Sequence, residues 1–277
     1  MQGRVLIVAG SDSGGGAGIQ ADIKTITALG AYAATAITAL TAQSTRGVHD
    51  IMPVPPSFIA RQMEVVLDDI GADCIKTGML HSAEVIEAVV RTCERHARGV
   101  PLVVDPVMVA KGGAALLQPE AVSALKLRLL PLAALVTPNA PEAEALTGQP
   151  VRGIDDLSAA ADGLLALGAG AALVKGGHLP GDTVTDLLRT ADGGELWLES
   201  PRIETTSTHG TGCTLASAVA AGVAQGLRLS DAVSRATDYV QQAIRTAPQL
   251  GGGHGPLNHA HPLERAAADG NPEIASK

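Results

Sequence analysis

The stretch Thr208–Cys213 combines two glycines, Gly210 and Gly212, with small polar side chains. The alanine-rich run Thr214–Ala221 follows directly and predicts the start of a buried helix. A glycine-rich turn that leads into a helix leaves several backbone N–H groups unpaired, and the helix dipole adds positive potential there. Such a turn is suited to bind an anion, for example a phosphate group. The alternative is a close-packed junction in which the glycines only provide clearance.

Carboxylate, amide and ammonium groups elsewhere could complete a phosphate site. Asn139 and Glu142 stand three residues apart at the start of a predicted helix, where Glu142 could hold Mg²⁺ through water. The same spacing fits an N-terminal capping box. Asp105 ends an apolar run and therefore needs a cation or N–H donors as a partner. Lys175, which is similarly placed, could offset phosphate charge or form an ion pair with Asp105.

Gln43 and Cys213 offer a different chemistry. The Gln43 carboxamide presents donors and an acceptor, which suits the edge of an aminopyrimidine in two hydrogen bonds, although it could simply stabilise its own loop. Cys213 lies at the predicted helix N-terminus, where the pKa of a thiol is expected to fall and the thiolate to become reactive. A buried structural cysteine is the other interpretation.

Apolar strand-like runs, each followed by a helical pattern, must position these residues. The first run, Arg4–Ala9, leads into the glycine-rich loop Gly10–Gly18 and a helix at about residues 19–29, in which Asp22 is either a ligand-facing acid or an exposed helix residue. Later units repeat this order. Polar residues stand at or just past the ends of the runs: Asp12, Gln43, Lys76, Asp105, Asn139 and Lys175. Because parallel strands end at one edge of a sheet, we expect a single ligand crevice there.

The remainder of the chain departs from this alternation. Residues 183–189 and 195–198 are expected to pair antiparallel, and two helices are expected at about residues 213–225 and 230–247. The sequence contains neither a linker nor an internal repeat, so residues 1–264 are predicted to form a single domain. Residues 265–277 are polar and are predicted to form a disordered tail.

Composition narrows the classes of function. The net charge of −8 and the pI near 5.4 argue against nucleic acid or an anionic membrane as a partner, so phosphate chemistry must rely on local positive potential or Mg²⁺. Aromatic residues make up only 1% of the chain, so a flat ligand would be gripped by aliphatic, methionine or backbone groups. The three cysteines form no disulfide framework and no apolar run is long enough to span a membrane, which favours a cytoplasmic protein.

Several blocks, ordered over roughly residues 4–260, closely resemble the bacterial hydroxymethylpyrimidine/phosphomethylpyrimidine kinases of thiamin biosynthesis, within the ribokinase-like superfamily. The blocks are Ala9–Asp22, Ile37–Thr45, Lys76–Leu80, Asp105–Met108, Thr137–Glu142, Lys175–His178, Thr208–Cys213 and Gly255–His259. The resemblance implies an α/β fold, a three-layer αβα sandwich with a mostly parallel central sheet and helices on both faces. It also implies ATP-dependent phosphorylation of 4-amino-5-hydroxymethyl-2-methylpyrimidine and then of its monophosphate.

The resemblance further implies roles for individual residues. The residues implied to contact the pyrimidine are Gly10, Asp22, Gln43, Met79 and Val107. Those implied to serve the nucleotide are Asp105, Asn139, Lys175 and Thr208, with Glu142 and Asp105 at Mg²⁺. Gly210, Thr211, Gly212 and Cys213 would cradle the transferred phosphoryl group, with the Cys213 thiolate as candidate base. Most superfamily members have Asp at this last position, whereas this family has Cys. Relatives often pair, so a homodimer is expected.

Two other functions deserve comparison. A pyridoxine or pyridoxal kinase is the nearest, because some relatives phosphorylate that ring on the same scaffold, and a pyridoxal aldehyde could form a hemithioacetal with Cys213. A non-catalytic pyrimidine or vitamin sensor would be expected to lack the phosphate and Mg²⁺ residues, yet Glu142, Lys175 and Gly210–Gly212 are present. A metal site made of His254, His259 and His261 is less favoured than solvated histidines.

Overall fold

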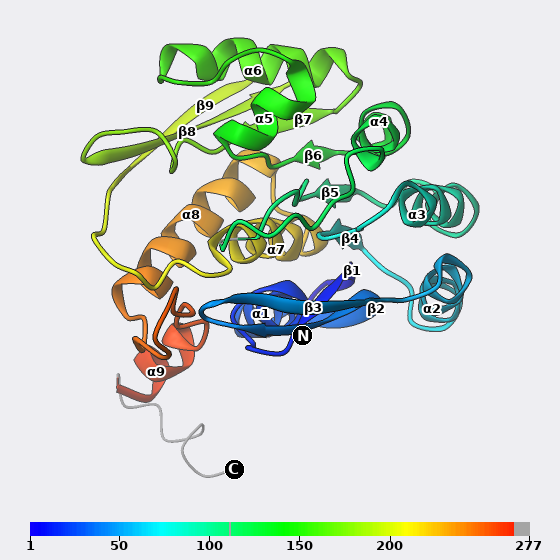
Figure 1. The fold of residues 1–277 in the computed structure, drawn as a ribbon, viewed down its shortest axis with the longest axis horizontal. Coiled ribbons are helices and arrows are strands. Elements are labelled where there is room, and N and C mark those ends of the chain that lie inside the picture. The colour runs from blue at the N-terminus through cyan, green and yellow to red at the C-terminus, as the bar shows by residue number, and fades with distance from the viewer. Residues whose placement is uncertain (111, 269–277) are drawn as a thin grey trace.

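The computed structural model describes residues 1–110 and 112–268 (Figure 1). Within these residues, nine strands form one sheet in the order β3-β2-β1-β4-β5-β6-β7-β8-β9. The strands are β1 (Arg4–Asp12), β2 (Tyr32–Ser44), β3 (Gly47–Pro53), β4 (Cys74–Thr77), β5 (Leu102–Val104), β6 (Leu135–Val136), β7 (Ala171–Val174), β8 (Thr183–Thr190) and β9 (Glu195–Pro201). The six central strands, β2 to β7 in spatial order, run parallel, whereas β3, β8 and β9 run antiparallel to their neighbours. The predicted mostly parallel sheet and the predicted antiparallel pair are both confirmed.

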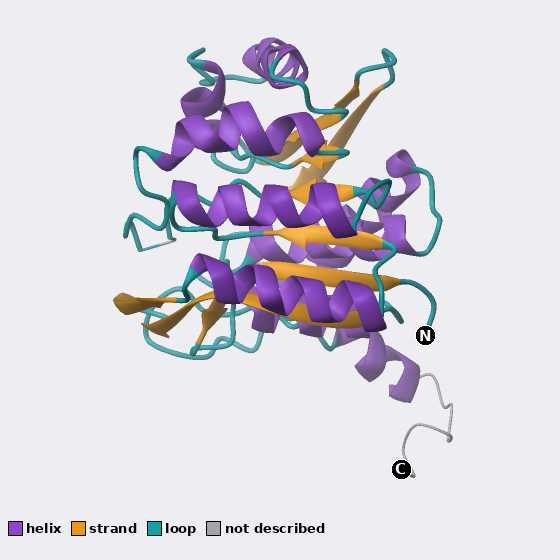
Figure 2. Ribbon diagram, turned by 90° about the vertical axis from the view of Figure 1, so that its right-hand side faces the viewer, coloured by secondary structure: helices purple, strands orange, loops and turns teal. Residues whose placement is uncertain are grey.

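Helices cover both faces of this sheet, as Figures 1 and 2 show. The helices are α1 (Gly18–Ala28), α2 (Pro56–Asp69), α3 (Ala83–His96), α4 (Ala121–Ala124), α5 (Ala140–Thr147), α6 (Asp155–Ala166), α7 (Thr211–Ala224), α8 (Leu229–Arg245) and α9 (His261–Ala268). Helix α4 continues as a π-helical turn, η1 (Leu125–Leu129), and a 3₁₀ turn, η2 (Leu130–Leu132). Helices α2 to α6 pack on one face through one core, and α1, α7 and α8 pack on the other face through a second core. The molecule is therefore the three-layer αβα sandwich that the sequence predicts.

The central strands are short and apolar because both of their faces are covered. All residues of β5 and β7 are buried, including Val103, Val104, Leu173 and Val174. An exposed face would instead give alternation of apolar and polar residues, as in β9, where half-buried and exposed positions alternate. Polar side chains that could contact a ligand are therefore found at the strand ends, at the edge of the packed core.

Several segments differ from the sequence predictions. Strand β2 continues to Ser44 and turns into β3, a strand that the sequence analysis did not predict. Helix α7 begins at Thr211, so Gly212 and Cys213 belong to its first turn. Helix α9 runs to Ala268, which corrects the predicted tail at residues 265–268, while residues 269–277 lie outside the described residues. No helix of the described chain is both long and apolar enough to cross a membrane.

Candidate active site

A cavity of about 920 Å³ lies at the carboxyl ends of the parallel strands. The polar residues that the sequence places at the strand ends all line it: Asp12, Gln43, Lys76, Asp105, Asn139 and Lys175. The residues Thr208–Cys213 line the same cavity. The prediction of one shared crevice at this edge of the sheet is therefore confirmed.

Gly210 gives the anion turn its shape. It is the N-cap of α7 in the left-handed conformation, with φ 82° and ψ 8°, and its carbonyl accepts hydrogen bonds from the Thr214 backbone N–H at 2.9 Å and the Thr214 hydroxyl at 2.8 Å. A Cβ atom here would lie 1.9 Å from the Gly16 carbonyl oxygen, so glycine is required. Within the described chain, the N–H groups of Gly210, Gly212 and Cys213 donate to no protein acceptor. These three donors are available to an anion.

Lys175 supplies positive charge beside this turn. Its Nζ lies 3.3 Å from Asp105 Oδ1, and a Cβ atom on Gly212 would lie 3.2 Å from the same Nζ. The Asp105–Lys175 ion pair considered from the sequence is thus present. Burial lowers the pKa of Lys175, but Asp105 and Glu142 raise it by more, so the ammonium keeps its charge. Asp105 Oδ2 is buried and has no hydrogen-bond partner among the described residues.

Asn139 and Glu142 form the capping box that their spacing indicates. The Asn139 side chain accepts from the Glu142 N–H, and the Glu142 carboxylate accepts from the Asn139 N–H, both at 2.9 Å. Both residues also line the cavity, so the capping role and a ligand-facing position coexist. Burial raises the pKa of Glu142 to about 7, the nearby Asp105 charge adds to the rise, and Lys175 opposes it.

Cys213 differs from the prediction of a depressed thiol pKa. Burial raises the pKa of Cys213 to about 12, and the charges of Asp22 and Asp105 add to the rise. Lys76 and the Gly18 N–H favour the thiolate but are outweighed. The sequence suggested a thiolate because a helix N-terminus stabilises anions, but desolvation and two nearby carboxylates oppose that effect. At neutral pH the resting thiol is protonated.

Part of the cavity wall is apolar. Gly10, Gln43, Met79 and Val107, which the resemblance implies contact the pyrimidine, are all among the residues that line the cavity. A Cβ atom on Gly10 would lie 3.0 Å from Met79 Sδ, so the glycine lets the backbone approach the cavity beside the methionine. Met79 and Val107 belong to one small apolar cluster, in which Val107 is partly buried. Whether they enclose a ring stays a prediction.

Asp22 is the predicted substrate residue that the structure does not place at the cavity surface. Its side chain is fully buried, and both carboxylate oxygens accept from Lys76 Nζ at 2.9 Å. The Ser217 hydroxyl donates to Asp22 Oδ1 at 2.7 Å. Burial lowers the pKa of Lys76, but the Asp22 carboxylate raises it above its usual range. Any effect of Asp22 on the cavity is therefore exerted through Lys76, which does line it.

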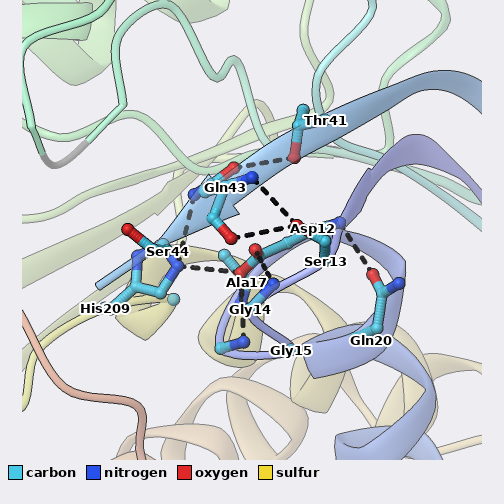
Figure 3. Close-up of polar contacts among 12 residues, drawn as sticks. Asp12, Ser13, Gly14, Gly15, Ala17, Gln20, Thr41, Gln43, Ser44 and His209 are labelled. Carbon is cyan, nitrogen blue, oxygen red and sulfur yellow. Dashed lines mark hydrogen bonds and ion pairs between the residues drawn. The ribbon is translucent and has the colours of Figure 1, made fainter. Parts of the chain in front are cut away.

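Asp12 was expected only to line the crevice, and His209 received no role of its own from the sequence. His209 Nε2 lies 2.9 Å from Asp12 Oδ2 and 3.3 Å from Gln43 Nε2 (Figure 3). The residues lie in the two glycine-rich motifs, which was the available signal, but 197 positions separate them. Their contact depends on how the two motifs pack.

The remaining histidines do not form the metal site considered from the sequence. His259 is buried with its Nε2 3.0 Å from the Thr214 hydroxyl, and burial lowers the pKa of His259 to about 4. His261 packs against Tyr239 with ring centroids 4.7 Å apart, and His254 lines the cavity. Within the described residues, no group of three or more His, Cys, Asp or Glu side chains is placed to hold a metal ion.

Comparison with known proteins agrees with this site. A family profile described as phosphomethylpyrimidine kinase matches residues 12–258. A hydroxymethylpyrimidine/phosphomethylpyrimidine kinase from Streptomyces coelicolor is 50% identical over 259 residues, which cover 94% of this chain and 95% of the relative. A thiamine biosynthesis bifunctional protein from Geobacter sulfurreducens is 55% identical over 260 residues, but the chain spans only about half (52%) of its length.

Solved structures match the whole fold. A Bacillus subtilis pyridoxal kinase in complex with ADP has a TM-score of 0.86 at 37% identity, over 94% of this chain and 98% of that one. A phosphomethylpyrimidine kinase from Clostridium difficile has a TM-score of 0.76 at 40% identity, over 87% and 99%. Fold and site together define a kinase of the ribokinase-like class. The chain belongs to the phosphomethylpyrimidine kinase family.

Proposed function

We propose that the protein transfers the γ-phosphoryl group of ATP to the hydroxymethyl oxygen of 4-amino-5-hydroxymethyl-2-methylpyrimidine, and then a second phosphoryl group to the monophosphate, in thiamin biosynthesis. The observation that carries the proposal is one cavity lined both by Gly210, Gly212 and Cys213, whose N–H groups have no protein acceptor among the described residues, and by Gln43 with Met79. The names of relatives at 45–50% identity support this substrate. The name of a relative at 55% identity supports a place in thiamin biosynthesis.

The residues of the chain supply mainly positioning and charge. The N–H groups of Gly210, Gly212 and Cys213 would hold the equatorial oxygens of the transferred group, with Lys175 beside Gly212 offsetting their charge. Gln43 and the apolar wall would hold the heterocycle so that its hydroxymethyl oxygen faces the phosphorus in line. Such transfers need little general-base assistance, which suits a protonated Cys213 thiol.

The residues also fit Mg²⁺ bound with the nucleotide. Asp105 Oδ2 is a buried carboxylate oxygen without a protein partner, and Glu142 lines the same cavity. Oxygen ligands from one or two carboxylates, completed by water and phosphate oxygens, are what Mg²⁺ requires. When bound, the ion would neutralise charge on the β- and γ-phosphates. Asn139 and Thr208 would serve the nucleotide.

Product analysis tests the proposal directly. Incubation with the pyrimidine alcohol and ATP should yield the monophosphate and then the pyrophosphate, resolved by anion-exchange chromatography. Formation of the monophosphate alone would remove the second step. ATP consumption that does not depend on the alcohol would contradict the proposal altogether.

Pyridoxal is a second candidate substrate, because pyridoxal kinases have TM-scores of 0.85–0.86 with this chain. The Cys213 thiol lines the cavity, where it could add to an aldehyde. The sequence relatives named for the pyrimidine are more similar, so we expect a higher kcat/KM for the pyrimidine alcohol. Side-by-side kcat/KM values for the two alcohols decide between them.

We also propose that the protein acts in the cytoplasm, where ATP is available, and as a homodimer. The open edge of the sheet supports pairing, because Leu40 of β2 and Met52 of β3 are cross-strand partners with 45% and 68% of their surfaces exposed. Light scattering coupled to size-exclusion chromatography measures the mass. A Met52→Lys variant should weaken the dimer.

A further inference from the structure

Asp12, which lines the cavity, is the hub of a hydrogen-bond network beside Gln43 and His209 (Figure 3). Its carboxylate accepts from the backbone N–H groups of Gly14 at 2.8 Å, Gly16 at 3.0 Å and Ala17 at 2.8 Å. Burial raises the pKa of Asp12, but His209 and these N–H groups lower it by more, so the carboxylate is ionised and accepts only. The proton between Asp12 and His209 therefore sits on His209 Nε2.

The neighbours of Gln43 fix the orientation of its carboxamide. The Thr41 hydroxyl donates its single proton to the Ser11 carbonyl at 2.9 Å, so toward Gln43, 3.1 Å away, it can only accept. The single proton on His209 Nε2 goes mainly to Asp12 Oδ2 at 2.9 Å. Because a protonated ring nitrogen has no lone pair, its 3.3 Å contact with Gln43 can only be the second, weaker branch of a three-centre bond that the same N–H donates. Both contacts are satisfied when the Gln43 oxygen faces His209 and its nitrogen faces Thr41. A half-turn of the amide from the arrangement in Figure 3 gives this assignment, which follows from the partners.

His209 has little freedom to move. A Cβ atom on Gly16 would lie 2.5 Å from His209 Cδ2, so the imidazole packs directly on the glycine-rich loop. The His209 backbone N–H donates to the Gly255 carbonyl at 3.0 Å, and the next residue is Gly210 of the anion turn. His209 thus connects the loop that follows β1, the glutamine near the end of β2 and the turn that begins α7.

We propose that Asp12 and His209 are positioning residues that hold the Gln43 carboxamide in one orientation and thereby select an aminopyrimidine. Held in this way, Gln43 keeps one lone pair and one N–H for the ligand. An aminopyrimidine edge offers an amino donor beside a ring-nitrogen acceptor, which is complementary to both. Pyridoxal has no adjacent pair of this kind, because a methyl group separates its ring nitrogen from its phenolic oxygen. The inference rests on the proposed substrate.

The 4-oxo analogue of the pyrimidine alcohol tests the inference, because its carbonyl and ring N–H reverse the donor and acceptor order. The wild-type protein should prefer the amino compound over the oxo compound by about a hundredfold in kcat/KM. His209→Leu frees the amide to turn and should reduce that preference by about tenfold, mainly through KM for the heterocycle, with KM for ATP unchanged. His209→Gln keeps an N–H donor toward Asp12 and should keep the preference within about threefold of wild type.

The experiment distinguishes failure of the proposed function from failure of the inference. Absence of turnover of the amino compound by the wild-type protein would overturn the proposed function. Turnover with equal kcat/KM for the amino and oxo compounds would overturn the inference alone, even if neither variant folds. An unchanged preference in His209→Leu would do the same. His96→Leu, which removes the exposed histidine 3.1 Å from Asp68, is the matched control and should leave both kcat/KM values unchanged.

Discussion

Cys213 shows how strongly the surroundings of a residue change its chemistry. A thiol at a helix N-terminus is expected to ionise easily, yet burial and the charges of Asp22 and Asp105 raise the pKa of Cys213 to about 12. Its Sγ is therefore a neutral, weakly hydrogen-bonding group in the wall of the cavity. We therefore expect the backbone N–H groups of the turn, and not the thiol, to bind the anion.

Replacement of Cys213 by alanine should therefore lower kcat by less than about tenfold, since a general base would contribute a hundredfold or more. The pH dependence of kcat between pH 6 and 9 should keep its shape, because a thiol that is protonated throughout adds no inflection. Steady-state kinetics with the pyrimidine alcohol provide the measurement, with Cys213→Ser as control. A hundredfold loss in both variants would restore the thiolate-base hypothesis.

Glu142 links stability to pH. Its folded-state pKa is raised to about 7 from an ordinary value of 4.5, so the folded protein binds a proton that the unfolded chain has lost between these values. Stability from this group is therefore present below pH 4.5 and is lost as pH rises through 7, by up to about 3 kcal/mol. Glu142→Gln should remove this loss of stability with rising pH. Urea unfolding at pH 5 and pH 8 should show a smaller pH effect in the variant than in wild type, and equal effects would argue against a raised pKa.

At the scale of elements, the site depends on how helix N-termini and strand ends meet. The α7 turn packs against the glycine-rich loop after β1, because Gly210 leaves room for the Gly16 carbonyl. Helix α5 starts with a capping box that also faces the cavity. Helices α1 and α7 and strand β4 join through Asp22, Ser217 and Lys76. The elements that line the cavity therefore also contact one another.

Gly210→Ala should destabilise the protein much more than Gly226→Ala. Both glycines have φ 82°, which costs an alanine about 1–2 kcal/mol, but nothing lies within 4 Å of a Cβ atom on Gly226. At Gly210 the clash with Gly16 adds to that penalty, so we expect a further loss of about 2 kcal/mol or more. Denaturant unfolding of the two variants measures the difference. Equal losses of stability in the two variants would mean that the α7 turn can move away from the glycine-rich loop after β1 without cost.

Lys76→Met should be among the most destabilising substitutions at the site. It leaves the Asp22 carboxylate buried without its cation, which typically costs about 3–5 kcal/mol. The double variant Lys76→Met with Asp22→Asn removes the uncompensated charge and should recover part of the loss. Urea unfolding of the single and double variants forms the test. A double variant no more stable than Lys76→Met would show that packing, not charge, sets the cost.

At the scale of the whole molecule, one sheet edge collects residues from Gly10 to Cys213. The parallel order of β2, β1, β4, β5, β6 and β7 directs every one of their carboxyl ends toward the same cavity. The flanking helices supply two separate apolar cores, one on each face of the sheet. We therefore expect a ligand that binds at this edge to stabilise the whole folded domain against unfolding.

A nucleotide should consequently stabilise the entire fold. At a concentration 100 times its Kd, an ATP analogue with Mg²⁺ should add about 2.7 kcal/mol of stability, seen as a higher Tm in a thermal melt. Gly212→Val should reduce this shift, because its side chain would displace Lys175 from the turn. The nucleotide-free Tm of the variant serves as its own control. An unchanged shift would place the nucleotide phosphates elsewhere.

Local pattern predicted much of this molecule. Apolar runs such as residues 102–104 and 171–174, each followed by a helical pattern, indicated strands covered on both faces, and glycines at 210 and 212 before an alanine-rich run indicated a turn with free N–H groups at a helix start. The antiparallel pair at the end of the sheet also followed from its turn residues. Strand β3 and helix α9 were missed, because short segments held by tertiary contacts have weak periodicity of their own.

The sequence by itself determined the alternation of strands and helices along most of the chain, the edge of the sheet at which polar residues collect, and the resemblance that indicates a kinase, because each depends on spacing along the chain. Only the tertiary structure decided that Asp22 is buried against Lys76, that the Cys213 thiol is neutral, and that Asp12 meets His209. The physical reason is that desolvation and hydrogen bonding depend on neighbours from distant segments, and no spacing along the chain specifies those neighbours.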